Sequence, residues 1–278
     1  YEKLNKERLK SLERGFHFKG EYFPAKINFK NKVYKVKLRL KGDYLDHFKE
    51  DKWSFRVKVK GENSIMGMKK FSLHNPAARN NIGEWIFHKI LKDEGLIGLK
   101  YEFVSVILNG KDIGLYAIEE HFDKITIESN NRKEGPIIKF AEDLFWKNKM
   151  KKFSEISNKD DYFISDINGY NEKVFREDSA LNIYKKSLSL LKSYRDGELP
   201  FSKIFNEDLM AKFYALSELL GAHHGLYWNN LRFYYNPITS KLEPIGFDAN
   251  AFRFLEMYNT KLKTSRLGIW DNESYYNW

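Results

Sequence analysis

The sequence of 278 residues contains no cysteine. Disulfide bonds, thiolate catalysis and zinc-thiolate sites are therefore excluded. No apolar run reaches the length that spans a membrane, and no apolar segment precedes a small-residue cleavage site of the signal-peptide kind. Because the chain begins abruptly at Tyr1, we expect it to be a part of something longer, and any membrane association would depend on a segment missing from it.

Glycine-rich phosphate loops of the standard kinds are also missing. Gly42-Asp43 follows a predicted strand, but it has neither the G-x-G-x-x-G nor the Walker spacing, so the Rossmann and P-loop classes are set aside. No motif recurs at the spacing of a solenoid repeat.

Positive charge and aromatic rings are abundant. The formal net charge of +10 favours polyanionic partners without choosing among them. Aromatic residues make up 16% of the chain, which favours a globular core that contains β-structure. The length suits one large domain or two lobes that share a cleft. No nucleic-acid-binding motif accompanies the basic strands, so we expect no nucleic acid partner.

The first 60 residues predict one helix and two strands. Residues 1–14 place Leu4, Leu9 and Leu12 among alternating charges, which is typical of an amphipathic surface helix or of a stalk next to a membrane. Residues 33–41 and 55–60 alternate apolar and basic side chains, so each predicted strand has one apolar and one basic face. The basic face is either solvated or aimed into a cleft that holds phosphates.

A helix is predicted to begin at Asn75-Pro76 and to end at Gly95. Its expected buried stripe consists of the apolar residues at helical spacing, namely Ile82, Trp85, Ile86 and Ile90. Arg79, Glu84 and Lys89 lie off this stripe. We therefore expect each of them to be solvated or aimed at a neighbouring site.

Asn109-Gly110 joins two β-rich runs and is a strong signal of a hairpin. Glu119 and Glu120 stand where the second of these strands should end. Adjacent strand residues point to opposite faces, so we expect one of the two to be a solvated partner of the basic stripe, and the pair does not suit a glycosidase.

Two features separate this hairpin from the last motif. Residues 141–200 form a polar insertion with helical periodicity from Leu181 to Leu191. After Asn206, apolar residues at helical spacing predict a buried helix that ends at Gly221.

The run N-N-L-R-F-Y-Y-N-P-I-T-S-K-L-E-P-I-G-F-D-A-N contains Asn229, Asn230, a predicted hairpin and Asp248. An amide and an acid at the two ends of a tight hairpin can converge on one Mg²⁺, as in phosphoryl-transfer enzymes. The alternative is that Asp248 caps a turn and that one of the two asparagines is a turn residue. His223 and His224 lack the spacing of transition-metal ligands.

Several motifs in this order resemble the CotH kinase family, atypical kinases named for a bacterial spore-coat protein. The motifs are R-L-K-G-D, W-S-F-R-V-K-V, G-M-K-K-F-S-L-H-N-P-A-A-R-N-N, L-N-G-K-D-I-G-L-Y-A-I-E-E-H-F-D and N-L-R-F-Y-Y-N-P-I-T-S-K-L-E-P-I-G-F-D. They cover most of the chain apart from the insertion and both ends.

The resemblance implies an α+β, two-lobed, atypical protein-kinase-like fold in a single domain. We expect a β-rich N-lobe over about residues 15–125 and a mainly helical C-lobe over residues 126–278. The implied reaction transfers the γ-phosphate of ATP to a hydroxyl of a protein or of a surface glycan, with Mg²⁺ or Mn²⁺ as cofactor. A bacterial cell-surface or secretory setting is also implied.

The resemblance also assigns residues to roles. Asp248 stands at the metal-binding acid, and Asn230 or its neighbour Asn229 completes the metal site. Glu120 falls on the family's acid near the junction of the lobes. The phosphate-binding cations are Arg79 and two residues of one strand, Arg56 and Lys58.

The chain departs from the kinase pattern at the catalytic base. A kinase places an Asp five residues before the metal-binding Asn. That position is Gly225 counted from Asn230 and His224 counted from Asn229, and Asn250 replaces a second acid of the family. Either His224 or its neighbour His223 helps as a base, or the protein is a pseudokinase or polyanion-binding scaffold.

Overall fold

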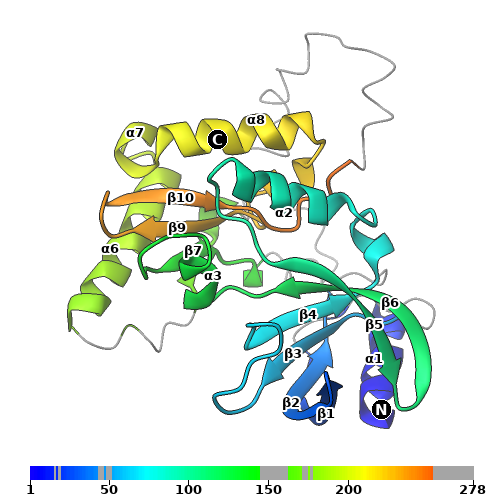
Figure 1. Cartoon of the computed structure of the whole chain (residues 1–278). Coiled ribbons are helices and arrows are strands. Elements are labelled where there is room, and N and C mark those ends of the chain that lie inside the picture. The colour runs from blue at the N-terminus through cyan, green and yellow to red at the C-terminus, as the bar shows by residue number, and fades with distance from the viewer. Residues whose placement is uncertain are drawn as a thin grey trace. The chain divides into compact units, whose positions relative to one another are not determined.

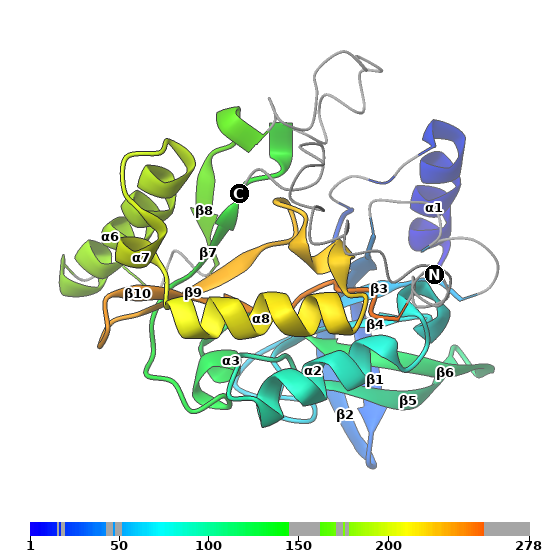
Figure 2. The same ribbon diagram turned by 90° about the horizontal axis from the view of Figure 1, so that it is seen from above.

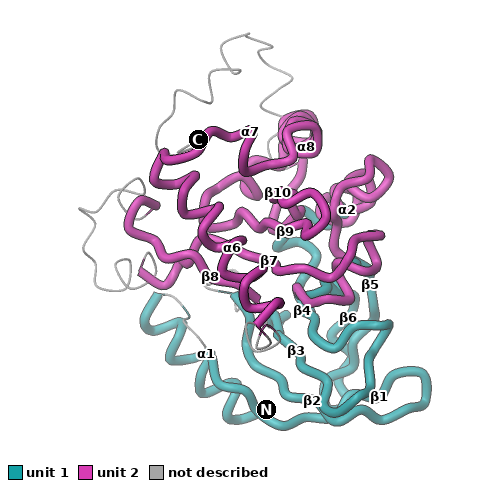
Figure 3. The backbone as a smooth tube through the Cα atoms, turned by 90° about the vertical axis from the view of Figure 1, so that its left-hand side faces the viewer, with its two compact units in different colours: residues 1–82, 100–121 teal, residues 83–99, 122–278 magenta. Residues whose placement is uncertain are grey.

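The computed structural model describes residues 1–15, 17, 20–42, 47, 52–144, 162–170, 175 and 178–252. It has the predicted α+β class, with antiparallel sheets and several helices (Figure 1, and from above in Figure 2). Two compact units divide the chain: unit 1 is residues 1–82 and 100–121, and unit 2 is residues 83–99 and 122–278 (Figure 3). Asp43 and residues 145–161, 171–174 and 176–177 of the predicted insertion lie outside the described residues.

Unit 1 is built on a six-stranded antiparallel sheet in the order β1-β2-β3-β4-β6-β5. Its strands are β1 (Phe23–Phe29), β2 (Lys32–Leu40), β3 (Phe55–Val59), β4 (Lys70–His74), β5 (Tyr101–Leu108) and β6 (Lys111–Glu120). The structure confirms both alternating strands and the hairpin, in which Asn109 and Gly110 have φ angles of 51° and 83°. Strand β1 was not predicted from the sequence; it pairs with β2 through a turn at Lys30-Asn31.

The two faces of this sheet differ as the alternation predicts. One face forms the core of unit 1, where β2, β3, β4 and β6 contribute Val36, Leu40, Phe55, Val57, Phe71 and Tyr116. The helix α1 (Glu2–Arg14) adds Leu4 to this core. Tyr1 stacks on Trp53 with ring centroids 5.2 Å apart, so the predicted N-terminal helix is packed on unit 1.

The helix predicted from Asn75-Pro76 is two elements. Asn75 caps the 3₁₀ turn η2 (Pro76–Arg79), and α2 (Gly83–Asp93) begins only after Asn80 and Asn81 have adopted φ angles of 51° and 57°. These left-handed residues end the first turn and reset the helical face. The buried residues of α2 are Gly83, Glu84, Phe87, His88 and Leu91, so the predicted apolar stripe was wrong.

Unit 2 combines helices with a four-stranded antiparallel sheet in the order β10-β9-β7-β8. The strands are β7 (Ile137–Phe140), β8 (Ile167–Gly169), β9 (Arg232–Asn236) and β10 (Lys241–Ile245). The helices are α2, α3 (Lys124–Glu128), α6 (Asp178–Arg195), α7 (Phe201–Ile204), α8 (Glu207–Leu219) and the 3₁₀ turn η4 (His223–Leu226). The structure confirms the predicted hairpin as β9–β10 and the predicted helices as α6 and α8.

Helix α2 lies beside α8 in unit 2 (Figure 1, Figure 2). The rings of Phe87 and Phe213 meet edge to face with centroids 6.4 Å apart. Gly246 approaches Leu91 and Phe87 so closely that it has no room for a Cβ, which brings the end of β10 against α2. Over the described residues, no helix is both long and apolar enough to cross a membrane.

Candidate functional site

In unit 2, the hairpin β9–β10 leads into residues 246–252, which we name the Asp248 loop. The turn η4 packs directly against this loop. A Cβ placed on Gly225 would lie 3.0 Å from the carbonyl oxygen of Phe247 and 3.2 Å from the Cα of Ala249. Little room is therefore left for a side chain at the position five residues before Asn230.

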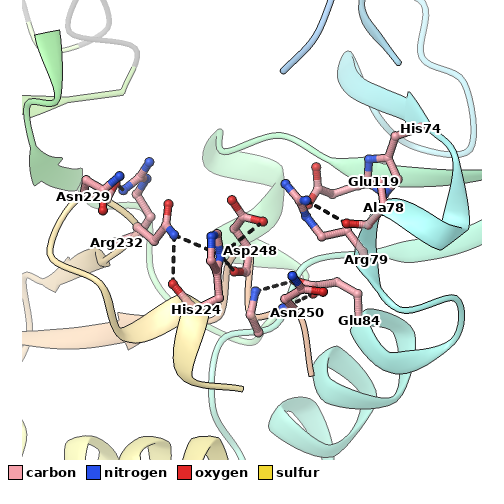
Figure 4. A network of polar contacts seen from close by, with 12 residues as sticks. His74, Ala78, Arg79, Glu84, Glu119, His224, Asn229, Arg232, Asp248 and Asn250 are labelled. Atoms are coloured by element: carbon pink, nitrogen blue, oxygen red, sulfur yellow. Dashed lines mark hydrogen bonds and ion pairs between the residues drawn. The ribbon is translucent and has the colours of Figure 1, made fainter. Parts of the chain in front are cut away.

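His224 links Asp248 to Asn230 (Figure 4). Its Nδ1 lies 2.7 Å from the carbonyl oxygen of Asp248 and 3.7 Å from that residue's Oδ1. The carbonyl oxygen of His224 accepts a hydrogen bond of 2.8 Å from Nδ2 of Asn230. A carbonyl oxygen only accepts, so in this shorter contact Nδ1 of His224 is the donor, and in the tautomer that carries its proton there Nε2 has a lone pair; Nδ2 of Asn230 also lies 3.2 Å from Nδ1.

Asn229 has a different environment from Asn230. Its carbonyl oxygen accepts a hydrogen bond of 2.8 Å from Arg232, which also donates to the hydroxyl of Tyr170 over 2.7 Å (Figure 4). The Arg232 guanidinium, 3% exposed, stacks over the ring of Phe247 at 4.8 Å. The structure therefore brings Asn230, His224 and Asp248 together and ties Asn229 to Arg232.

Glu84, on α2, is the residue of this group whose role the sequence analysis did not identify. Its side chain is fully buried, and its two carboxylate oxygens accept hydrogen bonds from the backbone N–H groups of Ala249 and Asn250, at 3.0 and 2.9 Å. Of the two expectations for Glu84, solvation is wrong, because its buried side chain binds the neighbouring Asp248 loop. Asn250 is bound here through its backbone N–H.

Within unit 1, a group of buried polar side chains lies at the ends of β2, β4 and β6. Nζ of Lys41 lies 2.7 Å from a carboxylate oxygen of Glu119 and 3.3 Å from Nδ1 of His74. An ammonium only donates, so Nδ1 of His74 accepts and Nε2–H faces the hydroxyl of Tyr101 at 2.9 Å. His74 is therefore neutral in this arrangement.

The ionisation of this group follows from its burial and its charges. Burial alone would raise the pKa of Glu119, but the charges of Lys41 and Arg56 outweigh it and hold that pKa well below its usual range. Burial and the neighbouring Lys41 hold the pKa of His74 well below 6.5. The group therefore contains an ion pair and a neutral imidazole.

The predicted phosphate-binding cations belong to unit 1 and differ in burial. Arg56 and Arg79 are 8% and 9% exposed, and Arg79 donates to the carbonyl oxygen of Ala78 over 2.9 Å (Figure 4). Lys58 is half-buried, with its Nζ 4.2 Å from the ring centroid of Tyr22. Of the two cations on β3, Arg56 is thus the buried one.

The expectation that Glu119 or Glu120 is solvated was wrong, because the two are 1% and 4% exposed. Glu120 accepts a hydrogen bond of 3.0 Å from the backbone N–H of Lys100. Lys41 belongs to the predicted basic stripe and was not singled out within it. The signal that could have done so is its position at the end of that stripe, directly before Gly42.

Mg²⁺ binds oxygen ligands, and unit 2 offers two kinds of them. Asp248 supplies a carboxylate, and Asn230 keeps its amide oxygen for a ligand because Nδ2 is bound to His224. No cluster of three His, Asp or Glu side chains suited to a metal ion occurs within the described ranges. Mg²⁺ commonly takes one or two carboxylates together with substrate phosphates and waters, so this donor set fits a nucleotide-bound metal.

No curated protein matches the sequence. The family model described as CotH kinase protein matches residues 38–277, which is most of the chain. Membership of this family indicates a kinase-like function and the use of ATP. The sequence resemblance is thereby confirmed, and the chain belongs to the CotH kinase family.

Proposed function

We propose that the protein is a two-lobed atypical kinase that transfers the γ-phosphate of ATP to a hydroxyl of a protein or of a surface glycan. The observation that carries this proposal is the meeting of Asn230 and Asp248 at His224, directly before and after the hairpin β9–β10. An amide and an acid in this order are what a kinase uses to hold its metal.

The metal ligands in this proposal are Asp248 and the amide oxygen of Asn230. A bound Mg²⁺ or Mn²⁺ would neutralise charge that develops on the phosphates. Asn229 is the weaker candidate for a metal ligand. Its backbone carbonyl is bound by Arg232, whereas Asn230 is bound by His224, which contacts Asp248.

His224 is the candidate base. Because Nδ1 donates to Asp248, the lone pair on Nε2 is the acceptor that a substrate hydroxyl would need. Gly225, in contrast, is packed too closely for an acid at the usual position of the base. Phosphoryl transfer has a loose transition state, in which a base contributes little to the rate. A histidine can therefore serve as the base in place of an aspartate.

Lys41 joins Arg56, Lys58 and Arg79 as a proposed phosphate-binding cation. The contact with Glu119 fixes its ammonium, as the ion pair of a protein kinase fixes the strand lysine. The role of Glu120 near the junction of the lobes stays a prediction.

The test is transfer of radiolabelled phosphate from ATP with Mg²⁺ or Mn²⁺, to the protein itself and to added substrates. We expect Asp248→Asn to lower incorporation by at least about 100-fold, because the reaction loses charge stabilisation. Asp208→Asn, at an exposed aspartate of α8, is the matched control and should keep the wild-type rate. Equal incorporation of phosphate by Asp248→Asn and wild type would refute the proposed kinase activity.

A second candidate is a pseudokinase that binds an acidic polymer through unit 1. Like charges face one another across its strands, with Lys26 opposite Lys35 and Lys37 opposite Lys58. Such pairs destabilise a sheet unless an anion binds them. Salt-sensitive binding to heparin, without any shift of the melting temperature by ATP and metal, would favour this candidate.

A further inference from the structure

The peptide group between Asp248 and Ala249 is held at both ends in unit 2 (Figure 4). Its carbonyl oxygen accepts from Nδ1 of His224 at 2.7 Å, and its N–H donates to Oε1 of Glu84 at 3.0 Å. The next N–H, of Asn250, donates to Oε2 of Glu84 at 2.9 Å. These hydrogen bonds fix the peptide plane from two directions. They therefore also fix the backbone position of Asp248, to which its side chain is attached.

The backbone of the Asp248 loop needs such support. Asp248 and Asn250 have φ angles of 50° and 52°, in the left-handed region that costs a non-glycine residue free energy. Left-handed residues that alternate with ordinary ones point successive N–H groups to the same side, where they bind an anion. In this protein the bound anion is the carboxylate of Glu84.

The carboxylate of Glu84 is itself held in place. It is 0% exposed, and Nε2 of His88, one turn along α2, lies 3.6 Å from its Oε1. Nδ1 of His88 accepts the backbone N–H of Leu99 at 3.2 Å, so in the neutral ring the proton is on the nitrogen that faces Glu84.

The first residue of α2 also touches the loop. A Cβ on Gly83 would lie 2.5 Å from the carbonyl oxygen of Ala251, so only glycine allows this approach. The start of the helix and the loop therefore form one packed body.

We infer that Glu84 is the positioning residue of the metal site: it fixes the orientation of Asp248 through the loop backbone without touching the metal. This inference rests on the proposed function, since it takes Asp248 as a metal ligand. It adds to that function a residue 164 positions earlier in the sequence, on a different element.

The test uses Glu84→Gln in the full chain, since this change keeps the shape of the side chain but replaces one acceptor with a donor. We expect the amides of Ala249 and Asn250 to exchange hydrogen at least about tenfold faster than in wild type. The Mn²⁺ concentration for half-maximal transfer should rise at least about tenfold, as for other residues that orient metal ligands. The KM for ATP at saturating Mn²⁺ should stay within about twofold, and excess Mn²⁺ should restore kcat.

Glu94→Gln is the matched control, because Glu94 is an exposed carboxylate just after α2 whose partner, Lys212, lies 3.4 Å away. It should leave exchange in the Asp248 loop and the Mn²⁺ requirement unchanged. Should Glu84→Gln fail to fold, Glu84→Asp provides the same test, since it keeps both oxygens on a shorter side chain that no longer reaches both N–H groups.

The outcomes separate this inference from the proposed function. Unchanged exchange of the Ala249 and Asn250 amides would overturn the role of Glu84, whatever the activity. Faster exchange with an unchanged Mn²⁺ requirement in an active enzyme would overturn it as well. A wild-type protein that neither transfers phosphate nor binds nucleotide with Mn²⁺ would refute the proposed function and the metal role of Asp248. The exchange data would still measure how strongly Glu84 stabilises the Asp248 loop.

Discussion

In unit 1 the buried side chains of Lys41, His74 and Glu119 bind one another, whereas in unit 2 those of Glu84 and His224 bind backbone groups. Lys41, His74 and Glu119 contact each other directly. Glu84 and His224, in contrast, each bind backbone groups of the Asp248 loop. The contacts in unit 1 neutralise buried charge, and the contacts in unit 2 fix the backbone conformation of the Asp248 loop.

This difference teaches how each unit can place a functional group. A buried ion pair gives its members fixed positions only while both are present, because either one alone is an uncompensated charge. A loop held through its main chain presents side chains whose identity can change while the backbone keeps its shape. Asn250 in place of the family's acid is consistent with such a loop.

The largest expected effect comes from breaking the ion pair of unit 1. Glu119→Gln leaves the ammonium of Lys41 buried without its counter-charge, so we expect a loss of about 3–5 kcal/mol in the free energy of unfolding. Urea denaturation followed by circular dichroism measures it. The double variant Lys41→Met with Glu119→Leu should recover most of the loss, because it removes both charges.

Glu62→Gln is the control, since Glu62 pairs with Lys69 at 2.8 Å but is 97% exposed. It should leave the urea midpoint unchanged, because solvent screens this pair. A double variant as unstable as Glu119→Gln would contradict the ion-pair interpretation and indicate a loss of packing.

A smaller effect is expected in unit 2, at Arg232. Arg232→Lys keeps the charge but loses the planar fork that binds the carbonyl oxygens of Asn229 and Leu231 and the hydroxyl of Tyr170. We expect a loss of about 1.5–3 kcal/mol in the free energy of unfolding, the range for hydrogen bonds to charged groups. Arg14→Lys, at an exposed residue of α1, should change nothing; an equal loss in both variants would contradict the role of the fork.

Local patterns were sufficient to predict much of the fold. Alternation of apolar and basic residues predicted β2 and β3, Asn109-Gly110 predicted the hairpin β5–β6, and helical spacing after Asn206 predicted α8. In each case the signal lies within a few residues of the element. The order of the motifs was equally sufficient to identify the family.

The contacts of the candidate sites were not predictable in the same way. Glu84 meets Ala249 across 165 positions, and Lys41 meets Glu119 across 78. The neighbouring sequence does not indicate which residue each of them meets. The face of α2 was mispredicted for a local reason, because two left-handed asparagines separate η2 from α2 and the apolar spacing runs through that break.

The smallest expected effect is a difference in acid sensitivity caused by His74. Its pKa lies well below 6.5 in the fold, because of burial and the charge of Lys41, with Arg79 and His47 acting the same way and Glu119 opposing them. Below about pH 6.5 the His74 imidazole is protonated in the unfolded chain but stays neutral in the folded chain. Stability conferred by the neutral ring is therefore complete above that pH and declines as the pH falls, by up to about 1.4 kcal/mol per pH unit.

His74→Gln removes this titration while keeping an acceptor for Lys41 and a donor for Tyr101. We expect the free energy of unfolding of wild type to fall more steeply between pH 7 and pH 5 than that of the variant. His17, whose pKa burial lowers to about 4, adds the same slope to both proteins and so cancels in the comparison. Parallel curves would mean that His74 titrates alike in the folded and unfolded chains, and the interpretation of the unit 1 group as an ion pair beside a neutral imidazole would fail.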